Sequence, residues 1–207
     1  SSAFYVTSTD LVAITGVHLI ILSIKYGYTD ITPFIYGVYG LIECAYLGNT
    51  PVGEQYANLA LKLTANNNKY CCRVVYLTTC MIKHWSNHLS EAIPSLSYSY
   101  KKGFEYGDLE YASYALVSYV LYPFYVGDNL SKVKQIMIDH EGLILETKMD
   151  MLINMYMFNW QVILNLLGEA PGDKIVGEKY DEFKSIKYFE ENKEYNALCQ
   201  IQYVKSY

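Results

Sequence analysis

The chain has 207 residues, of which 52% are hydrophobic and 18% are charged, and its formal net charge is −5. Lys and Arg form no cluster beyond pairs such as Lys101 and Lys102, which argues against nucleic-acid binding, because phosphate affinity needs many basic contacts. The five cysteines include no C-x-x-C pair. Free, buried thiols in a reducing compartment are therefore expected, and with them a cytoplasmic location.

Membrane insertion is also disfavoured. Two uncharged runs, 111–127 and 151–168, approach the length of a membrane span, but the second contains Asn154, Asn159 and Asn165. Such amides are costly in hydrocarbon, so buried helices are the preferred interpretation. No basic region followed by an apolar stretch and a small-residue cleavage site opens the sequence, so no secretion signal is expected.

Turn-forming segments divide the sequence at regular intervals. One set recurs every forty residues, at 27–30, 67–70, 107–110 and 147–150. A second set lies midway between these, at 47–50, 85–87, 126–128 and 167–169. Both sets contain Gly, Asn, Ser or Asp, residues that adopt left-handed backbone at a helix end or cap the next helix. The pattern predicts helices alternating with turns.

Between the turns, apolar residues recur with the period of a helix. In chain order we expect helices at 9–26, 32–47, 51–66, 70–84, 88–105, 108–126, 129–146 and 149–167, then a long loop at 169–185 and a last helix at 191–207. Thr50 and Pro51 suit the start of the third helix. Pro94 predicts a kink in the fifth helix or a late start for it.

The two helices of each pair differ in character. The first helices, such as 34–46 and 111–125, are apolar around most of their circumference and need neighbours on several sides. The second helices are amphipathic and leave one face in water. Four small residues lie within these helices, Gly37, Gly40, Ala57 and Ala60. They either permit close approach of neighbouring helices or are incidental.

These features predict an all-α fold, specifically a right-handed α-solenoid of antiparallel helix pairs, TPR-like, with a period of about 40 residues. Residues 1–207 then form one helical-repeat domain. Its repeats lie at about 28–67, 68–107, 108–147 and 148–190, with partial repeats at both ends. The last helix would have no partner, and residues such as Tyr195 and Tyr203 would pack on something beyond this chain. We therefore expect a fragment of a longer array.

Motifs for catalysis are missing from the sequence. Residues 168–174, GEAPGDK, are similar to a phosphate-binding loop, but the spacing is one residue short and Ile175 stands where a hydroxyl belongs. His84 and His88 are four residues apart, but a predicted turn separates them and no third metal ligand has suitable spacing. His18 and His140 are interpreted as packed histidines. We expect no catalytic residue, cofactor or metal, and thus no enzyme.

A tyrosine stripe is the remaining candidate for recognition. Tyr111, Tyr114, Tyr122 and Tyr125 fall within about 100° of one another on a helix, so they share a face. The favoured interpretation is packing between repeats. The alternative is a concave groove that grips a peptide or a small ligand. The candidate groove residues are Tyr39, Trp85, Tyr111, Tyr114, Tyr122, Tyr125 and Trp160.

Several segments carry a family resemblance. They are YGVYGL at 36–41, LGN at 47–49, FEYGDLEYA at 104–112, VGDNL at 126–130 and LNLLGE at 164–169. Together they resemble the helical-repeat region that follows the ATPase module in large multidomain signalling proteins. Those proteins join a serine/threonine-kinase-like domain, an AAA/STAND-type ATPase, a tetratricopeptide-like array, a GAF domain and a histidine kinase. The likeness spans about residues 10–205 and departs from the pattern at the polar run 66–69.

The resemblance implies a regulatory or scaffolding arm in signal transduction. Binding of a protein partner, of flanking domains or of a small effector would bias ATPase and kinase modules outside this chain. The alternative is a free-standing peptide-binding TPR adaptor, but expected helices 32–47 and 108–126 lack the Lys and Arg that clamp acidic peptides. A helical enzyme built around Tyr122, Trp85 and Trp160 would lack an acid–base pair.

Overall fold

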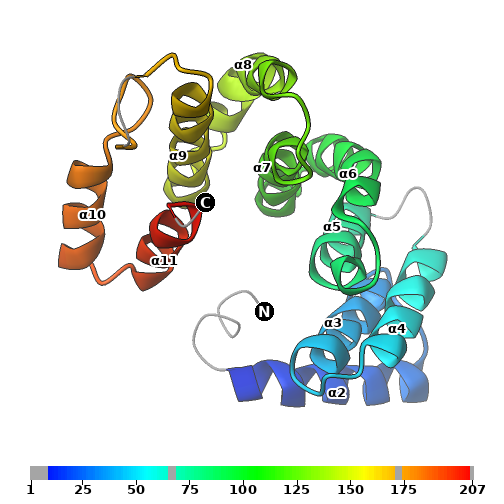
Figure 1. The fold of residues 1–207 in the computed structure, drawn as a ribbon. Coiled ribbons are helices and arrows are strands. Elements are labelled where there is room, and N and C mark those ends of the chain that lie inside the picture. The colour runs from blue at the N-terminus through cyan, green and yellow to red at the C-terminus, as the bar shows by residue number, and fades with distance from the viewer. Residues whose placement is uncertain (1–8, 65–68, 171–173, 206–207) are drawn as a thin grey trace. The chain divides into compact units, whose positions relative to one another are not determined.

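The fold is all-α. A computed structural model describes residues 9–64, 69–170 and 174–205, and within these ranges regular structure consists of helices and an isolated bridge between Val176 and Asp181. The helices are α2 (Thr9–Tyr26), α3 (Thr32–Ala45), α4 (Thr50–Leu63), α5 (Cys71–Met81), η1 (Lys83–Trp85), η2 (Leu89–Glu91), α6 (Ala92–Tyr106), α7 (Leu109–Tyr125), α8 (Leu130–Glu146), α9 (Asp150–Leu166), α10 (Glu182–Glu191) and α11 (Tyr195–Val204) (Figure 1). They group into two compact units, Ser1–Tyr122 and Pro123–Tyr207.

The first eight expected helices are all found, with small shifts at their ends. The expected helix 70–84 ends early, and its last residues form the 3₁₀ turn η1. The expected helix 88–105 begins as the 3₁₀ turn η2, and α6 starts at Ala92. Pro94 therefore lies in the first turn of α6, where a missing N–H breaks no helical hydrogen bond. The late start is thus the correct alternative for this proline.

The prediction for the C-terminal part was wrong in two respects. The expected loop 169–185 ends early, because α10 begins at Glu182 after the Asp181 side chain accepts hydrogen bonds from the amides of its first turn. The last helix, α11, also has a partner. It packs against α10, and its Ile201 is buried with Phe158 and Val162 of α9.

Turns with left-handed backbone lie 20 or 21 residues apart from Gly27 to Gly48 and again from Gly107 to Gly168. They occur at Gly27, Gly48, Gly107, Gly127, Lys148 and Gly168, which confirms the predicted turns at these positions. Several helices end in a Schellman motif, in which the amide after the left-handed residue bonds back to a carbonyl in the last helical turn. The amide of Asp108, for example, donates to the Gly103 carbonyl at 2.8 Å. Residues 67 and 68 of another predicted turn lie outside the described residues.

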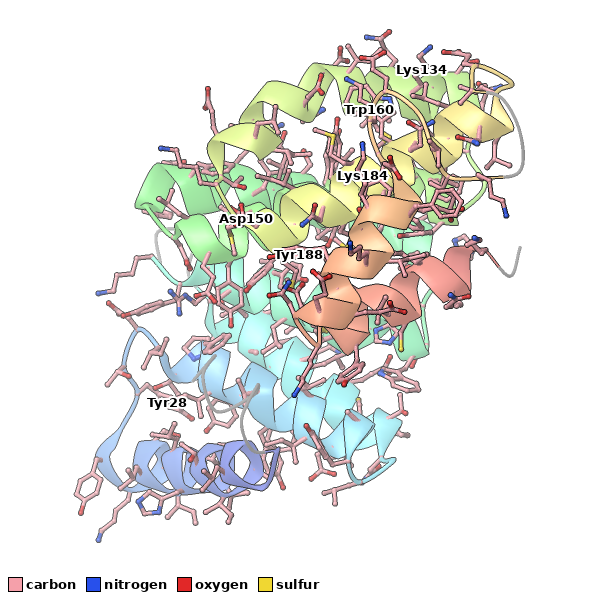
Figure 2. The ribbon with its side chains drawn as sticks, turned by 90° about the vertical axis from the view of Figure 1, so that its left-hand side faces the viewer. Tyr28, Lys134, Asp150, Trp160, Lys184 and Tyr188 are labelled. Atoms are coloured by element: carbon pink, nitrogen blue, oxygen red, sulfur yellow. The ribbon has the colours of Figure 1, made fainter. Side chains whose placement is uncertain are left out.

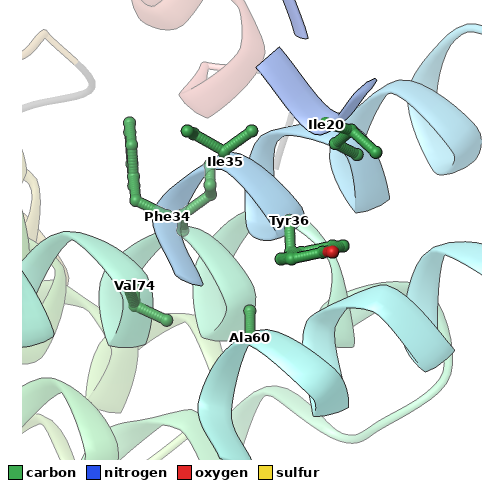
Figure 3. Packing of buried hydrophobic residues seen from close by; sticks show 7 residues of the cluster. Ile20, Phe34, Ile35, Tyr36, Ala60 and Val74 are labelled. Atoms are coloured by element: carbon green, nitrogen blue, oxygen red, sulfur yellow. The ribbon is translucent and has the colours of Figure 1, made fainter. Parts of the chain in front are cut away.

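Consecutive helices joined by short turns pack against each other. The pairs in contact are α3 with α4, α5 with α6, α8 with α9, and α10 with α11. In the first unit, the core contains Ile20 of α2, Phe34, Ile35 and Tyr36 of α3, Ala60 of α4, and Val74 and Leu77 of α5 (Figure 3). The hairpin of α3 and α4 thus buries apolar side chains on α2 and α5 as well as on its own helices.

Small residues allow α3 and α4 to pack unusually close together. A Cβ atom added to Gly40 would lie 2.8 Å from the Gly53 carbonyl oxygen, so the two backbones touch. Ala57 and Ala60 are fully buried on the same helix as Gly53. This confirms close approach at Gly40, Ala57 and Ala60. The role of Gly53 was not foreseen.

The second unit has its own core. It is built on α9, whose Phe158 and Val162 pack with Ile175, Tyr180, Phe189 and Ile201. Tyr156 is fully buried, and its hydroxyl donates to the Met137 carbonyl of α8 at 2.7 Å. Lys134 of α8 also pairs with Glu169, which follows α9. These contacts join α8 and α9 side by side, and Figure 2 places the labelled Lys134 and Trp160 in this region.

Candidate functional site

Two of the predicted groove tyrosines lie in one aromatic cluster. The Tyr111 ring is 5.7 Å from Tyr114 and from Phe34, and 6.0 Å from Tyr76, measured between centroids. The Arg73 guanidinium lies 4.9 Å above the Tyr111 ring, a cation–π distance. Arg73 also donates to both carboxylate oxygens of Asp108, at 2.7 Å and 3.1 Å. This cluster joins α3, α5 and α7, as expected of packing between helices.

The other candidate residues occupy different surroundings. Tyr39 is half-buried and meets Tyr56 edge to face at 4.6 Å, whereas Trp85 is 56% exposed. A side-chain hydrogen bond joins Tyr122 to Cys80 in the first unit. Tyr125 and Trp160 belong to the second unit.

Trp160 is packed within the second unit, whereas Tyr125 is 45% exposed. The Tyr125 hydroxyl donates to Asn159 at 3.2 Å. Trp160 is 3% exposed, and the Lys179 ammonium lies 4.0 Å from its ring centroid. The Trp160 indole N–H has no acceptor among the residues that the structure describes. That Trp160 binds a ligand stays a prediction.

Sequence reasoning missed a pocket in the first unit. It has a volume of about 380 Å³ and lies where α4, α5 and α6 meet the irregular segment 82–91. Its lining is Leu61, Val75, Thr79, Lys83, His84, Asn87, His88, Leu89, Glu91, Ala92, Pro94, Ser95 and Tyr98. Ligand pockets commonly measure about 300 to 1,000 Å³, so this one suits a small molecule. The two histidines first noted for their spacing thus line one cavity.

Some polar side chains of this pocket have hydrogen-bond partners and others do not. The His88 ring nitrogen Nδ1 caps η2 by accepting from the Ser90 amide at 3.3 Å, and Asn87 donates to Glu91 at 2.8 Å. Burial lowers the pKa of His84, an effect that a hydrogen bond to the Cys80 backbone partly opposes. Within the described part of the chain the Lys83 ammonium has neither an ion pair nor a hydrogen bond, whereas the Lys83 carbonyl accepts from the Ser86 and Asn87 amides. The pocket therefore contains the Lys83 ammonium, which has no ion-pair partner among the described residues, and one carboxylate, that of Glu91.

A second missed feature is the outer face of α2. We use this name for five apolar residues on one side of the helix that are 41–71% exposed, Leu11, Ile14, Val17, Ile21 and Ile24; the exposed His18 lies among them. Gly16 and Ile20 are buried instead, and an added Cβ at Gly16 would lie 2.9 Å from the Ile42 side chain of α3. In Figure 2, side chains project from the blue helix away from α3.

The repeated turns make this face comparable with other helices of the chain. Gly27, Gly107 and Lys148 have left-handed backbone and follow α2, α6 and α8. Aligning the three helices on these residues gives the equivalent positions. Where α2 has Ile14, Val17 and Ile21, α6 has Pro94, Ser97 and Lys101, and α8 has Gln135, Ile138 and Gly142. These three positions are all apolar in α2, whereas the equivalent positions are polar or mixed in α6 and α8.

Buried thiols and phenols predict sensitivity to alkali. Burial raises the pKa of the Cys72 and Cys80 thiols from 9.0 to about 12, and that of the Tyr111 phenol from 10.0 to about 12. Because the unfolded chain ionises these groups at lower pH, their contribution to stability is complete below about pH 9 and is lost as pH rises towards 12. We expect helical circular dichroism to fall in this window.

The exposed Cys199 provides the control for the alkaline transition. Cys199→Ser should leave the transition where it is, whereas Cys72→Ala should move it to higher pH. Superimposable curves for wild type and Cys72→Ala would contradict this assignment for Cys72.

Among the described residues, no three His, Cys, Asp or Glu side chains are grouped so as to hold a metal ion. None of the described helices is both long enough and apolar enough to cross a membrane. Comparisons with protein-family models, with curated proteins and with solved structures gave no match.

Proposed function

We propose that this chain is a non-catalytic scaffolding segment of a signal-transduction ATPase or kinase, a right-handed array of helix pairs that docks a protein partner or a flanking domain. The observation that carries the proposal is the outer face of α2. Exposed apolar patches of this kind on otherwise amphipathic repeats mark interaction surfaces. The resemblance of segments such as 104–112 to the repeat region of multidomain signalling proteins supports the same role.

The chemistry of the face favours a helical partner. Leu11, Ile14, Val17, Ile21 and Ile24 follow one another at spacings of three and four residues, the spacing of ridges that interdigitate with another helix. The stretch from Leu11 to Ile24 carries no Asp, Glu, Lys or Arg, so its complement is an apolar stripe. A membrane surface fits less well, since interfacial helices carry several basic residues and α2 has only Lys25.

Site-specific photo-crosslinking tests the proposal. A photoreactive amino acid at Ile14 in the full-length protein that carries this chain should crosslink to one peptide with apolar residues at helical spacing. The same amino acid at Leu145 is the matched control, because Leu145 is an exposed apolar residue of the equivalent helix α8. Mass spectrometry identifies the attached peptide.

Each other outcome of this experiment counts against the proposal. Crosslinking to lipid would replace the protein partner with a membrane surface. A product containing a second copy of the same stretch would make α2 a self-association surface. Equal labelling from Ile14 and Leu145 would show that the outer face of α2 has no special role.

A further inference from the structure

The pocket lies at an irregularity in the series of turns. At the other described turns that end α2, α3, α6, α7, α8 and α9, a residue with left-handed backbone follows the helix. After α5 the chain instead forms η1, a bend at Ser86 and Asn87, and η2. Departures from an otherwise repeated local pattern concentrate at functional sites. A cavity and a break in the pattern therefore coincide at residues 82–91.

The charges around the cavity indicate the kind of ligand. The titratable groups that line it are Lys83, His84, His88, Glu91 and Tyr98. Glu91 accepts a hydrogen bond from Asn87, and His88 caps η2, so both have local partners. Lys83 is half-buried and unpaired among the described residues. An ammonium that is partly removed from water gains most from an anion that replaces the lost solvation.

The rest of the lining is suited to an organic group. Leu61, Val75, Leu89 and Pro94 provide apolar contact area from four different elements. Thr79 and Ser95 add hydroxyls that donate to an anion without carrying charge. The combination of apolar walls with a few polar groups is typical of small-molecule sites.

We infer that this pocket binds a small organic anion, whose carboxylate or phosphate pairs with Lys83 and whose apolar part contacts Leu61, Val75 and Pro94. The inference deepens the proposed function, because it names the effector class and the place where an effector reaches the scaffold. The pocket and the outer face of α2 share no residue, so each can be tested without the other. Glu91, which also lines the pocket, favours a ligand with a single negative charge over one with several.

Titration of the whole chain with benzoate and with benzamide tests the inference. The two probes have nearly the same shape and differ in charge. Benzoate should shift the amide signals of residues 83–98 in NMR spectra, with a Kd on the order of 1 mM, whereas benzamide should bind about tenfold more weakly. Lowering the pH should strengthen benzoate binding, because His84 then becomes protonated within the pocket.

Variants at position 83 test whether the Lys83 ammonium is responsible for benzoate binding. Lys83→Met should weaken benzoate binding about tenfold, and Lys83→Arg should keep most of it. Lys101→Met is the matched control, since Lys101 is an exposed lysine of α6 outside the pocket. Equal binding of both probes would overturn the inference, as would equal losses in the Lys83→Met and Lys101→Met proteins. Absence of any shift with benzoate and with inorganic phosphate would also overturn it, while leaving the docking role of α2 intact.

Discussion

Replacing Gly53 by Ala should lower the free energy of unfolding of the first unit by about 3 kcal/mol. A Cβ atom at Gly53 would overlap the Cys44 sulfur and would lie 2.7 Å from the Gly40 carbonyl oxygen. The Cys44 side chain can rotate away, but a backbone oxygen cannot, so α3 and α4 must separate. Separation exposes Ala57 and Ala60, which are fully buried in the native pair. The cost therefore includes lost packing along the whole interface.

Chemical denaturation followed by circular dichroism measures this effect, and Gly142→Ala is its control. Gly142 lies within α8 and nothing surrounds its added Cβ within 4 Å. Alanine there should raise the stability of the second unit by about 0.5 to 1 kcal/mol, because it restricts the unfolded chain and favours the helix. Similar small effects at both positions would mean that α3 and α4 are not in backbone contact.

Replacing Lys205 by Met should destabilise the second unit by about 3 kcal/mol. The Glu182 carboxylate has a side-chain exposure of 1%, and its Oε2 atom accepts a hydrogen bond from the Lys205 ammonium at 2.8 Å. The other oxygen, Oε1, has no hydrogen-bond partner among the described residues. Loss of Lys205 would thus leave a buried charge without compensation, and α10 and α11 should detach together.

The double variant Glu182→Leu with Lys205→Met separates this cause from general damage to α11. Removal of both charges should recover most of the lost stability, since a buried ion pair often contributes no more than well-packed apolar residues. Denaturation of the two variants in parallel provides the comparison. If the double variant is as unstable as Lys205→Met alone, the buried carboxylate is not the source of the loss.

Most of the helix positions could be predicted from the sequence because the information is local. Gly27, Gly48, Gly107, Gly127 and Gly168 adopt left-handed backbone, which glycine tolerates without steric cost, so they mark helix ends. The apolar period between these glycines is sufficient to assign a helix. The same reasoning failed for α10, where charged residues stand between the apolar ones and only Phe189 of the apolar residues is deeply buried.

Less of the candidate site than of the fold could be predicted from the sequence. The pocket depends on two 3₁₀ turns that bring His84, His88 and Lys83 around one cavity, and their spacing gives no sign of this. Gly53 is a mid-helix glycine whose role depends on a contact with another helix. The outer face of α2 could have been found, however. Comparison of Ile14 and Ile21 with Pro94 and Lys101, at equivalent positions of the repeat, shows the excess of apolar residues without any structure.

The most direct test of the scaffolding role is the regulated activity of the full-length protein. Ile14→Asp with Ile24→Asp places two charges on the outer face of α2, and Ile138→Asp with Leu145→Asp does the same on α8, where these two apolar residues are also exposed. The account predicts that the α2 variant loses its response to effector or partner while the activity of the other modules persists, and that the α8 variant responds normally. A full response from the α2 variant would contradict it.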